Sequence, residues 1–246
     1  MPNLKVAVAQ VPSIKADVAK NIEVHLIAID KASSLGVSYI VFPELSLTGY
    51  ESGEALELAF SSDDIRLKPL VDSAIKNKIK IGVGAPLKAD GLPKIGVVII
   101  SETGVIETYE KMNLHPGEEE YFSNGRQYHS LAIKDSLIAN AICADTNNAF
   151  HAQYCFELGA SVYIAGVLIG ESGYESDTRV MAEYASKYNM LVAMANHNKP
   201  TGGWNPVGKS AIWSASGLLA SASEIQNALV VAEKQNDEWS AQVFEI

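Results

Sequence analysis

The chain has few cysteines and a deficit of positive charge. Cys143 and Cys155 are its two cysteines in 246 residues. This excludes a disulfide framework and makes a reduced, cytoplasmic location the simplest expectation. Lys and Arg number 19 against 29 Asp and Glu, a net charge of −10. Such a balance argues against a nucleic-acid partner, because phosphate binding needs clustered cations.

Long apolar runs and metal-ligand patterns are also missing. No segment approaches the roughly 18 consecutive apolar residues that a membrane-spanning helix needs. Residues Met1–Gln10 lack the basic stretch and following apolar stretch of a signal peptide. The five histidines show no HExxH spacing, and no CxxC pair is present. We therefore expect no membrane partner and no metal site.

Short apolar runs alternate with segments of helical period. Helices are predicted where apolar residues recur three and four apart: Ile14–Leu35, Asp63–Ile79, Ala149–Leu158 and Glu175–Tyr188. Strands are predicted over short β-branched runs: Leu4–Gln10, Val37–Glu44, Lys80–Pro86, Lys94–Ser101, Val105–Tyr109, Leu131–Ile133, Leu137–Cys143, Val162–Ala165, Leu191–Ala195, Ala211–Trp213, Leu218–Ser221 and, as the last, Ala228–Ala232. No Gly/Ser/Pro-rich linker divides the chain, so this order predicts one layered α/β domain over residues 1–246.

Three polar residues stand at the ends of predicted strands: Glu44, Lys111 and Cys143. Sites in open α/β sheets gather outside the carboxyl ends of strands. A carboxylate can take the proton of a thiol that attacks an amide carbon, and an ammonium can hold the resulting oxyanion. We also expect Lys111 to favour the thiolate of Cys143.

These residues lie within three motifs. Phe42–Tyr50 reads FPELSLTGY, Tyr109–Leu114 reads YEKMNL, and Ala141–Asp145 reads AICAD. The three candidates are separated by 67 and then by 32 residues. In content, order and spacing these segments resemble the glutamate, lysine and cysteine motifs of the nitrilase superfamily, the carbon–nitrogen hydrolases.

The resemblance implies a fold, an assembly and a reaction. The fold would be a four-layer αββα sandwich, usually assembled as a homodimer or larger homo-oligomer, that works without metal or organic cofactor. Glu44 would be the general base, Lys111 the oxyanion stabiliser and Cys143 the nucleophile that forms a thioester with a small linear amide. Glu119 would position Lys111, and the backbone N–H of Ala144 would be the second oxyanion donor.

One segment departs from the family pattern, and several alternatives stay open. Thr146–Asn148 stands where the family commonly has an Arg-Phe-Pro-Glu-like run, so the sequence does not define the substrate. A nitrilase or N-carbamoyl hydrolase on the same triad, and a catalytically silent binding protein, are alternatives. A cysteine peptidase that pairs Cys143 with His151 or His197 would leave the glutamate and lysine motifs unexplained. Cys155 is expected to be core.

Overall fold

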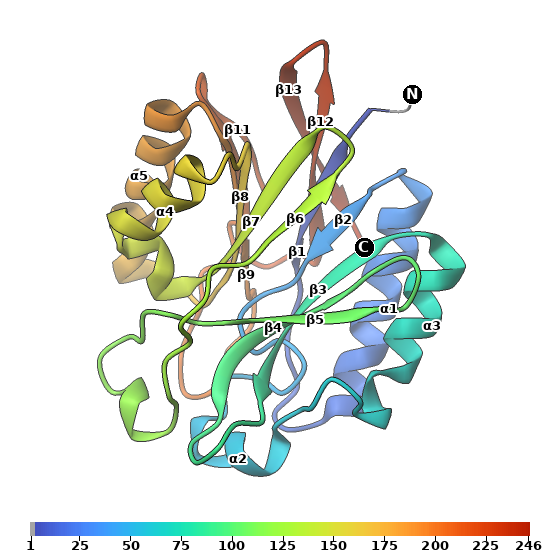
Figure 1. Cartoon of the computed structure of the whole chain (residues 1–246), viewed down its shortest axis with the longest axis vertical. Helices are drawn as coiled ribbons and strands as arrows, with labels where there is room; N and C mark the ends of the chain where they lie inside the picture. Colours follow the sequence, from blue (N-terminus) through green and yellow to red (C-terminus); the bar gives the residue numbers. More distant parts are fainter. Residues whose placement is uncertain (1–2) are drawn as a thin grey trace.

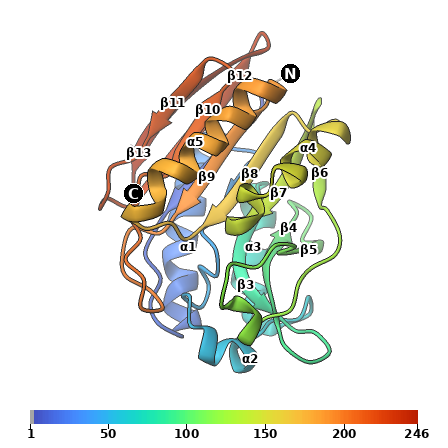
Figure 2. The same ribbon diagram turned by 90° about the vertical axis from the view of Figure 1, so that its left-hand side faces the viewer.

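Two β-sheets packed face to face form the centre of the molecule, and helices cover their outer faces. The structure is a computed structural model that describes residues 3–246. Helices α1 and α3 lie along one sheet, and α4 and α5 lie along the other (Figure 1, Figure 2). The layers therefore follow the order α, β, β, α, which confirms the four-layer sandwich implied by the resemblance.

The first sheet has seven strands and mixed direction. In spatial order they are β13 (Glu238–Glu245), β12 (Ala228–Gln235), β1 (Lys5–Gln10), β2 (Tyr39–Val41), β3 (Lys80–Leu87), β4 (Lys94–Ile100) and β5 (Ile106–Glu110). The neighbours β1, β2 and β3 are parallel, and the remaining pairs are antiparallel.

The second sheet has six strands. In spatial order they are β11 (Gly217–Ser221), β10 (Ala211–Ser214), β9 (Leu191–Asn196), β8 (Val162–Val167), β7 (Ser136–Ile142) and β6 (Ser130–Ile133). Here β7, β8 and β9 are parallel. Each sheet thus has a parallel centre, whose strands end in loops that can carry a site.

Five α-helices and four short 3-10 helices complete the described chain. The α-helices are α1 (Val18–Ser34), α2 (Ala55–Leu58), α3 (Lys68–Asn77), α4 (Ala149–Glu157) and α5 (Glu171–Tyr188). The 3-10 helices are η1 (Ser52–Glu54), η2 (Ile65–Leu67), η3 (Glu118–Glu120) and η4 (Cys143–Asn147).

Three apolar clusters hold the layers together. The cluster between the sheets includes Val8 and Val97 from the first sheet and Ile164 from the second. A second cluster joins α1 and α3 to the first sheet, and a third joins α4 and α5 to the second. At roughly 25 cal/mol per Å² of buried apolar area, these clusters supply the main driving force for folding.

Several element predictions need correction. Helix α3 begins at Lys68 and not at Asp63, α5 begins at Glu171 and not at Glu175, and the strand predicted to end at Glu44 ends at Val41. The helix predicted from Ile14 begins at Val18, because the Asp17 side chain accepts the N–H of Lys20 and caps the helix there. The sequence also predicts Ala228–Ala232 as the last strand, whereas β13 follows it. This strand lies at the edge of the sheet with much of its length exposed, so it lacks the apolar run of a buried strand.

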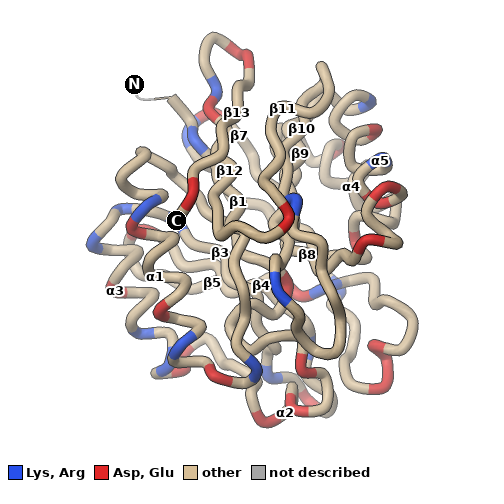
Figure 3. The backbone as a smooth tube through the Cα atoms, turned by 180° about the vertical axis from the view of Figure 1, so that it is seen from behind, with Lys and Arg blue, Asp and Glu red and all other residues tan. Residues whose placement is uncertain are grey.

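Charged side chains are dispersed over the outer helices and the loops, while most of the strand length is uncharged (Figure 3). Lys and Arg alternate with Asp and Glu along the outer helices instead of forming one basic stripe in this view. Among residues 3–246, no helix is long and apolar enough to cross a membrane.

Candidate active site

Four Asp, Glu, Lys or Arg side chains are buried among residues 3–246, and all four belong to one region. They are Glu44, Lys111, Glu118 and Asp145. A buried charge is costly unless an opposite charge or several hydrogen bonds compensate for it. The gathering of these four buried charged side chains in one region therefore marks a candidate site, because the fold must compensate for the cost of burying them.

The three residues singled out by the sequence meet in this region. Lys111 directly follows β5, Cys143 directly follows β7, and Glu44 lies three residues after β2. Lys111 Nζ donates to Glu44 Oε1 at 2.7 Å, and both side chains are almost completely buried. In front of them lies a cavity of about 50 Å³, lined by Glu44, Tyr50, His115, Glu118, Cys143, Leu168 and Trp204.

Glu118, and not Glu119, is the second carboxylate on Lys111. Lys111 Nζ donates to Glu118 Oε1 at 2.7 Å, and the hydroxyl of Tyr50 donates to the same oxygen. Glu119 is exposed, and its carboxylate accepts the N–H of Gly117. The prediction that Glu119 positions Lys111 is therefore wrong. The 3-10 turn η3 directs these adjacent side chains differently, and three consecutive glutamates offer no sequence signal that separates them.

Cys143 has a strained backbone at the start of η4. Its φ is +39°, in the left-handed region that non-glycine residues rarely adopt. Such strain persists only where the surroundings impose it. Asp145 is one such constraint, because its Oδ2 accepts the N–H of Ile142 at 3.0 Å. The thiol lies 3.8 Å from the carbonyl oxygen of Leu168, which begins the loop after β8.

Asp145 joins the cysteine turn to the lysine loop, a function that sequence reasoning missed. Its Oδ1 accepts the backbone N–H groups of Met112 and Asn113, at 3.1 and 2.8 Å, and the side-chain amide of Asn113. Its Oδ2 accepts the hydroxyl of Tyr109 at 2.7 Å. In the sequence, the position of Asp145 two residues after Cys143 was the signal that could have identified this function. These hydrogen bonds connect the residues on both sides of Lys111 to the turn that contains Cys143.

Burial dominates the electrostatics of the site. Burial raises the pKa of Glu44 to about 7; the Lys111 ammonium opposes this, and the negative charge of Glu118 adds to it. For Lys111, burial would lower the pKa, but the surrounding carboxylates more than offset it and the ammonium persists. Burial, followed by the charge of Glu44, raises the pKa of the Cys143 thiol well above its ordinary value.

The Lys111 ammonium does lower the pKa of Cys143, as expected, but burial and the charge of Glu44 outweigh it, so Cys143 is held as a thiol and not as the expected thiolate. Glu44 is placed to receive its proton. Among the described residues, Glu44 Oε2 is buried and has no hydrogen-bond partner, so it is available to accept a proton.

Neither histidine of the cysteine-peptidase alternative serves Cys143. His151 lies between the hydroxyls of Tyr109 and Tyr163, at 2.8 and 2.9 Å. His197 lies 2.8 Å from the carbonyl oxygen of Glu44. Both rings are engaged elsewhere, so the geometry gives this alternative no support.

The segment that departs from the family pattern stabilises the same loops. Thr146 Oγ1 donates to the carbonyl of Cys143 at 2.8 Å, and Asn148 Nδ2 donates to Asn113 Oδ1 at 2.7 Å. Asn148 also caps α4, because its side-chain oxygen accepts the N–H of Phe150. Thr146 thus contacts the backbone of Cys143, whereas Asn148 contacts the side chain of Asn113 and the first turn of α4.

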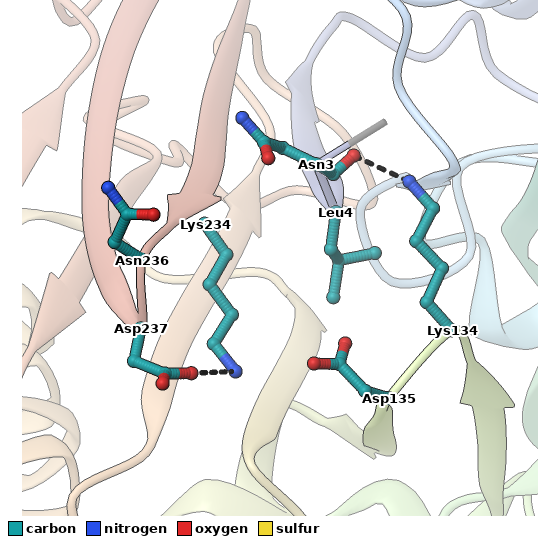
Figure 4. Close-up of a pocket in the computed structure, with 7 residues that line it drawn as sticks. All are labelled: Asn3, Leu4, Lys134, Asp135, Lys234, Asn236 and Asp237. Atoms are coloured by element: carbon teal, nitrogen blue, oxygen red, sulfur yellow. Dashed lines mark hydrogen bonds and ion pairs between the residues drawn. The ribbon is translucent and has the colours of Figure 1, made fainter. Parts of the chain in front are cut away.

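A larger cavity lies elsewhere and lacks comparable chemistry. It measures about 700 Å³ and is lined by Asn3, Leu4, Lys134, Asp135, Lys234, Asn236 and Asp237 (Figure 4). Lys234 pairs with Asp237 at 3.1 Å, and none of the lining residues is a thiol, hydroxyl or imidazole. Within residues 3–246, no cluster of three or more His, Cys, Asp or Glu side chains could hold a metal ion.

The sequence profile of the family described as Carbon-nitrogen hydrolase matches residues 5–241. The chain belongs to this family. Its members are hydrolases of carbon–nitrogen bonds, which confirms the enzyme class expected from the motifs. This carbon–nitrogen hydrolase also matches an (R)-stereoselective amidase from Pseudomonas sp., 24% identical over 162 residues. A glutamine-dependent NAD(+) synthetase from Thermotoga maritima is 23% identical over 205 residues.

These curated relatives are longer than the present hydrolase. The matches cover 65% and 80% of this chain but only 59% and 36% of the amidase and the synthetase. Among solved structures, an amidase from Nesterenkonia sp. AN1 superposes with a TM-score of 0.87 at 20% identity, covering 96% of this chain and 92% of that one. Solved structures of mutants of that amidase include a complex with butyramide and a covalent adduct of the acetamide moiety of fluoroacetamide at the active-site cysteine. The likeness confirms the fold.

Proposed function

We propose that this carbon–nitrogen hydrolase is an amidase that cleaves small linear amides through a thioester on Cys143. The observation that carries the proposal is the buried Glu44–Lys111 contact of 2.7 Å, next to a cavity that both Glu44 and Cys143 line. A carboxyl whose pKa lies near neutrality is suited to move protons at neutral pH.

Each group would have one task in the first half of the reaction. Glu44 takes the thiol proton as the sulfur bonds to the amide carbon, and the carbonyl oxygen becomes an oxyanion. The ammonium of Lys111 has three N–H donors, of which Glu44 and Glu118 receive two. The third serves the oxyanion together with the N–H of Ala144, which lies in the first turn of η4, where backbone N–H groups lack partners within the helix.

The second half regenerates the thiol. Protonated Glu44 gives its proton to the leaving nitrogen, the C–N bond breaks, and ammonia or an amine departs. Water then attacks the thioester while Glu44 accepts one of its protons. The C–S bond breaks, Cys143 recovers the proton, and a carboxylic acid is released.

The cavity favours a short acyl chain. Its volume of about 50 Å³ is only a few times the roughly 10–15 Å³ of cavity space that one water molecule needs. Trp204 lines it and is 49% exposed. A long substrate would have to displace this ring. The butyramide complex of the Nesterenkonia amidase supports a substrate of this class.

We further propose a homo-oligomer in a reducing compartment such as the cytoplasm. Cys143 and Cys155 are unpaired thiols, and the reaction needs the first of them reduced. No nucleic-acid or membrane partner is part of the proposal.

The experiment is an ammonia-release assay with a panel of acetamide, butyramide, glutamine, an N-carbamoyl amine and small nitriles. Cys143→Ala should lower turnover at least about 1,000-fold, as removal of a nucleophile does in other hydrolases. Cys155→Ala is the matched control, because this thiol is buried away from the cavity. Unchanged turnover in Cys143→Ala would refute the proposal. Hydrolysis of nitriles alone would favour the nitrilase alternative. A Cys143 that is labelled without any turnover would favour the silent binding protein.

A further inference from the structure

His197 lies behind the carboxylate of Glu44 and contacts its backbone. The histidine directly follows β9, is completely buried, and places Nε2 2.8 Å from the carbonyl oxygen of Glu44. A carbonyl oxygen only accepts, so Nε2 carries the proton and donates it. Nδ1 is then the unprotonated nitrogen, 3.3 Å from the hydroxyl of Ser13.

The contact is a hydrogen bond between neutral groups. Burial lowers the pKa of His197 to about 4, so the ring is uncharged near neutral pH. Its effect on Glu44 is therefore one of position. The ring does not compete with Lys111 for the carboxylate, because it bonds to the peptide and not to the side chain.

The backbone at Glu44 requires specific contacts to hold its conformation. Glu44 lies beyond β2, outside the regular strand ladder, and the next residue, Leu45, has a left-handed φ of +53°. A backbone of this kind is held only by specific contacts. The bond from His197 fixes the carbonyl that precedes this turn.

The residue before His197 holds the segment that contributes Leu168 to the cavity. Asn196 Oδ1 accepts the N–H of Ile169 at 3.0 Å, and its Nδ2 donates to the Ile169 carbonyl at 2.9 Å. Ile169 follows Leu168, whose carbonyl oxygen lies 3.8 Å from the Cys143 sulfur. Two consecutive residues at the end of one strand thus hold the backbone of the base and the backbone beside the nucleophile.

We propose that His197 is a positioning residue that holds Glu44 in reach of the Cys143 thiol through the Glu44 carbonyl. The inference rests on the proposed function, in which Glu44 is the base. Displacement of a catalytic group by about 1 Å can cost about 100-fold in rate. Loss of the hydrogen bond from His197 should therefore slow the chemical step more than it weakens substrate binding.

The test compares His197→Gln with His197→Asn. The amide nitrogen of glutamine reaches the place of Nε2 and can still donate to Glu44, whereas that of asparagine is too short. We expect kcat to fall about 30-fold or more in His197→Asn, with KM within about threefold, and to stay within about fivefold of the parent in His197→Gln. Asn198→Ala is the control, because this buried neighbour donates to Ile225 and Asn227 and not to the site.

A second readout does not need turnover. The rate at which iodoacetamide alkylates Cys143, followed by peptide mass spectrometry, should fall in His197→Asn and in Glu44→Gln. In the double variant it should fall no further than in Glu44→Gln, because both changes remove the same proton acceptor. A purely structural effect would add to the loss.

The outcomes separate the two proposals. If Glu44→Gln is alkylated like the parent, Glu44 is not the base and the proposed function fails. If Glu44→Gln is slow while folded His197→Asn behaves like the parent, the role of His197 is overturned. Additive losses in the double variant, or an equal loss in Asn198→Ala, overturn it too. If His197→Asn does not fold, alkylation of His197→Gln near the parent rate supports the role, and alkylation as slow as in Glu44→Gln overturns it.

Discussion

At the scale of single residues, burial and nearby charges together determine the protonation of the site residues. Glu44 and Glu118 share one ammonium, Lys111, in a region that excludes most water. Burial raises the pKa of Glu44, and the negative charge of Glu118 adds to this while the Lys111 ammonium opposes it. Burial, followed by the charge of Glu44, also raises the pKa of Cys143, so thiol and carboxyl together keep one mobile proton available.

This arrangement predicts an acidic limb in the pH profile. Glu44 accepts a proton only when ionised, so kcat/KM should fall about tenfold per pH unit below a pH of about 7. Burial is the main cause of the raised pKa of Glu44, but Glu118→Gln removes the negative charge that adds to it, so the limb should move to lower pH. This substitution should also lower kcat about 10- to 100-fold, because Lys111 loses a partner.

Glu119→Gln is the matched control for this prediction, since it changes an adjacent but exposed carboxylate. Its pH profile should follow that of the parent. A shifted limb in Glu119→Gln with a parental profile in Glu118→Gln would contradict the assignment of Glu118 as the second carboxylate on Lys111.

At the scale of elements, two strands pack against the loop that carries Glu44, and each of them contacts this loop through a glycine. A Cβ on Gly84 of β3 would lie 2.2 Å from the carbonyl oxygen of Pro43, and one on Gly166 of β8 would lie 2.4 Å from that of Phe42. The loop is thus held between a strand of each sheet at distances that exclude any side chain.

Gly166→Ala should therefore displace the loop that carries Glu44. We expect the free energy of unfolding, measured in urea, to fall by about 1–3 kcal/mol, as for other overpacked interiors. We also expect kcat to fall about tenfold or more, because the displaced loop carries Glu44, the proposed general base. Gly53→Ala is the control, because a Cβ there meets no atom within 4 Å. Equal, small effects of both changes would contradict the packing argument.

At the scale of the whole molecule, α4 and the residue that follows it, Leu158, carry several exposed apolar side chains. Phe150 is 77% exposed, Leu158 50%, and Tyr154 and Phe156 43% each. The helix shares its layer with α5 (Figure 2). Large exposed apolar groups gathered on one short element are typical of an interaction surface, which fits the proposed homo-oligomer.

Phe150→Asp should dissociate this assembly. A charge placed in an apolar interface must be desolvated without a partner, so light scattering after size exclusion should show a smaller mass than for the parent. Ile65→Asp is the control, because Ile65 is also 77% exposed but precedes α3. A parent that is already monomeric would contradict the prediction.

A single unfolding transition would agree with one domain over residues 1–246, which stays a prediction.

The sequence by itself determined the element types of the sheet centres and the three strand-end residues Glu44, Lys111 and Cys143. Apolar periodicity and short motifs are local properties, so they can be read along the chain. Only the tertiary structure decided which glutamate of η3 contacts Lys111, that Cys143 rests as a thiol, and that His197 meets the Glu44 carbonyl. Side-chain direction in an aperiodic turn and the degree of burial depend on segments that are distant in sequence, and no local pattern contains them.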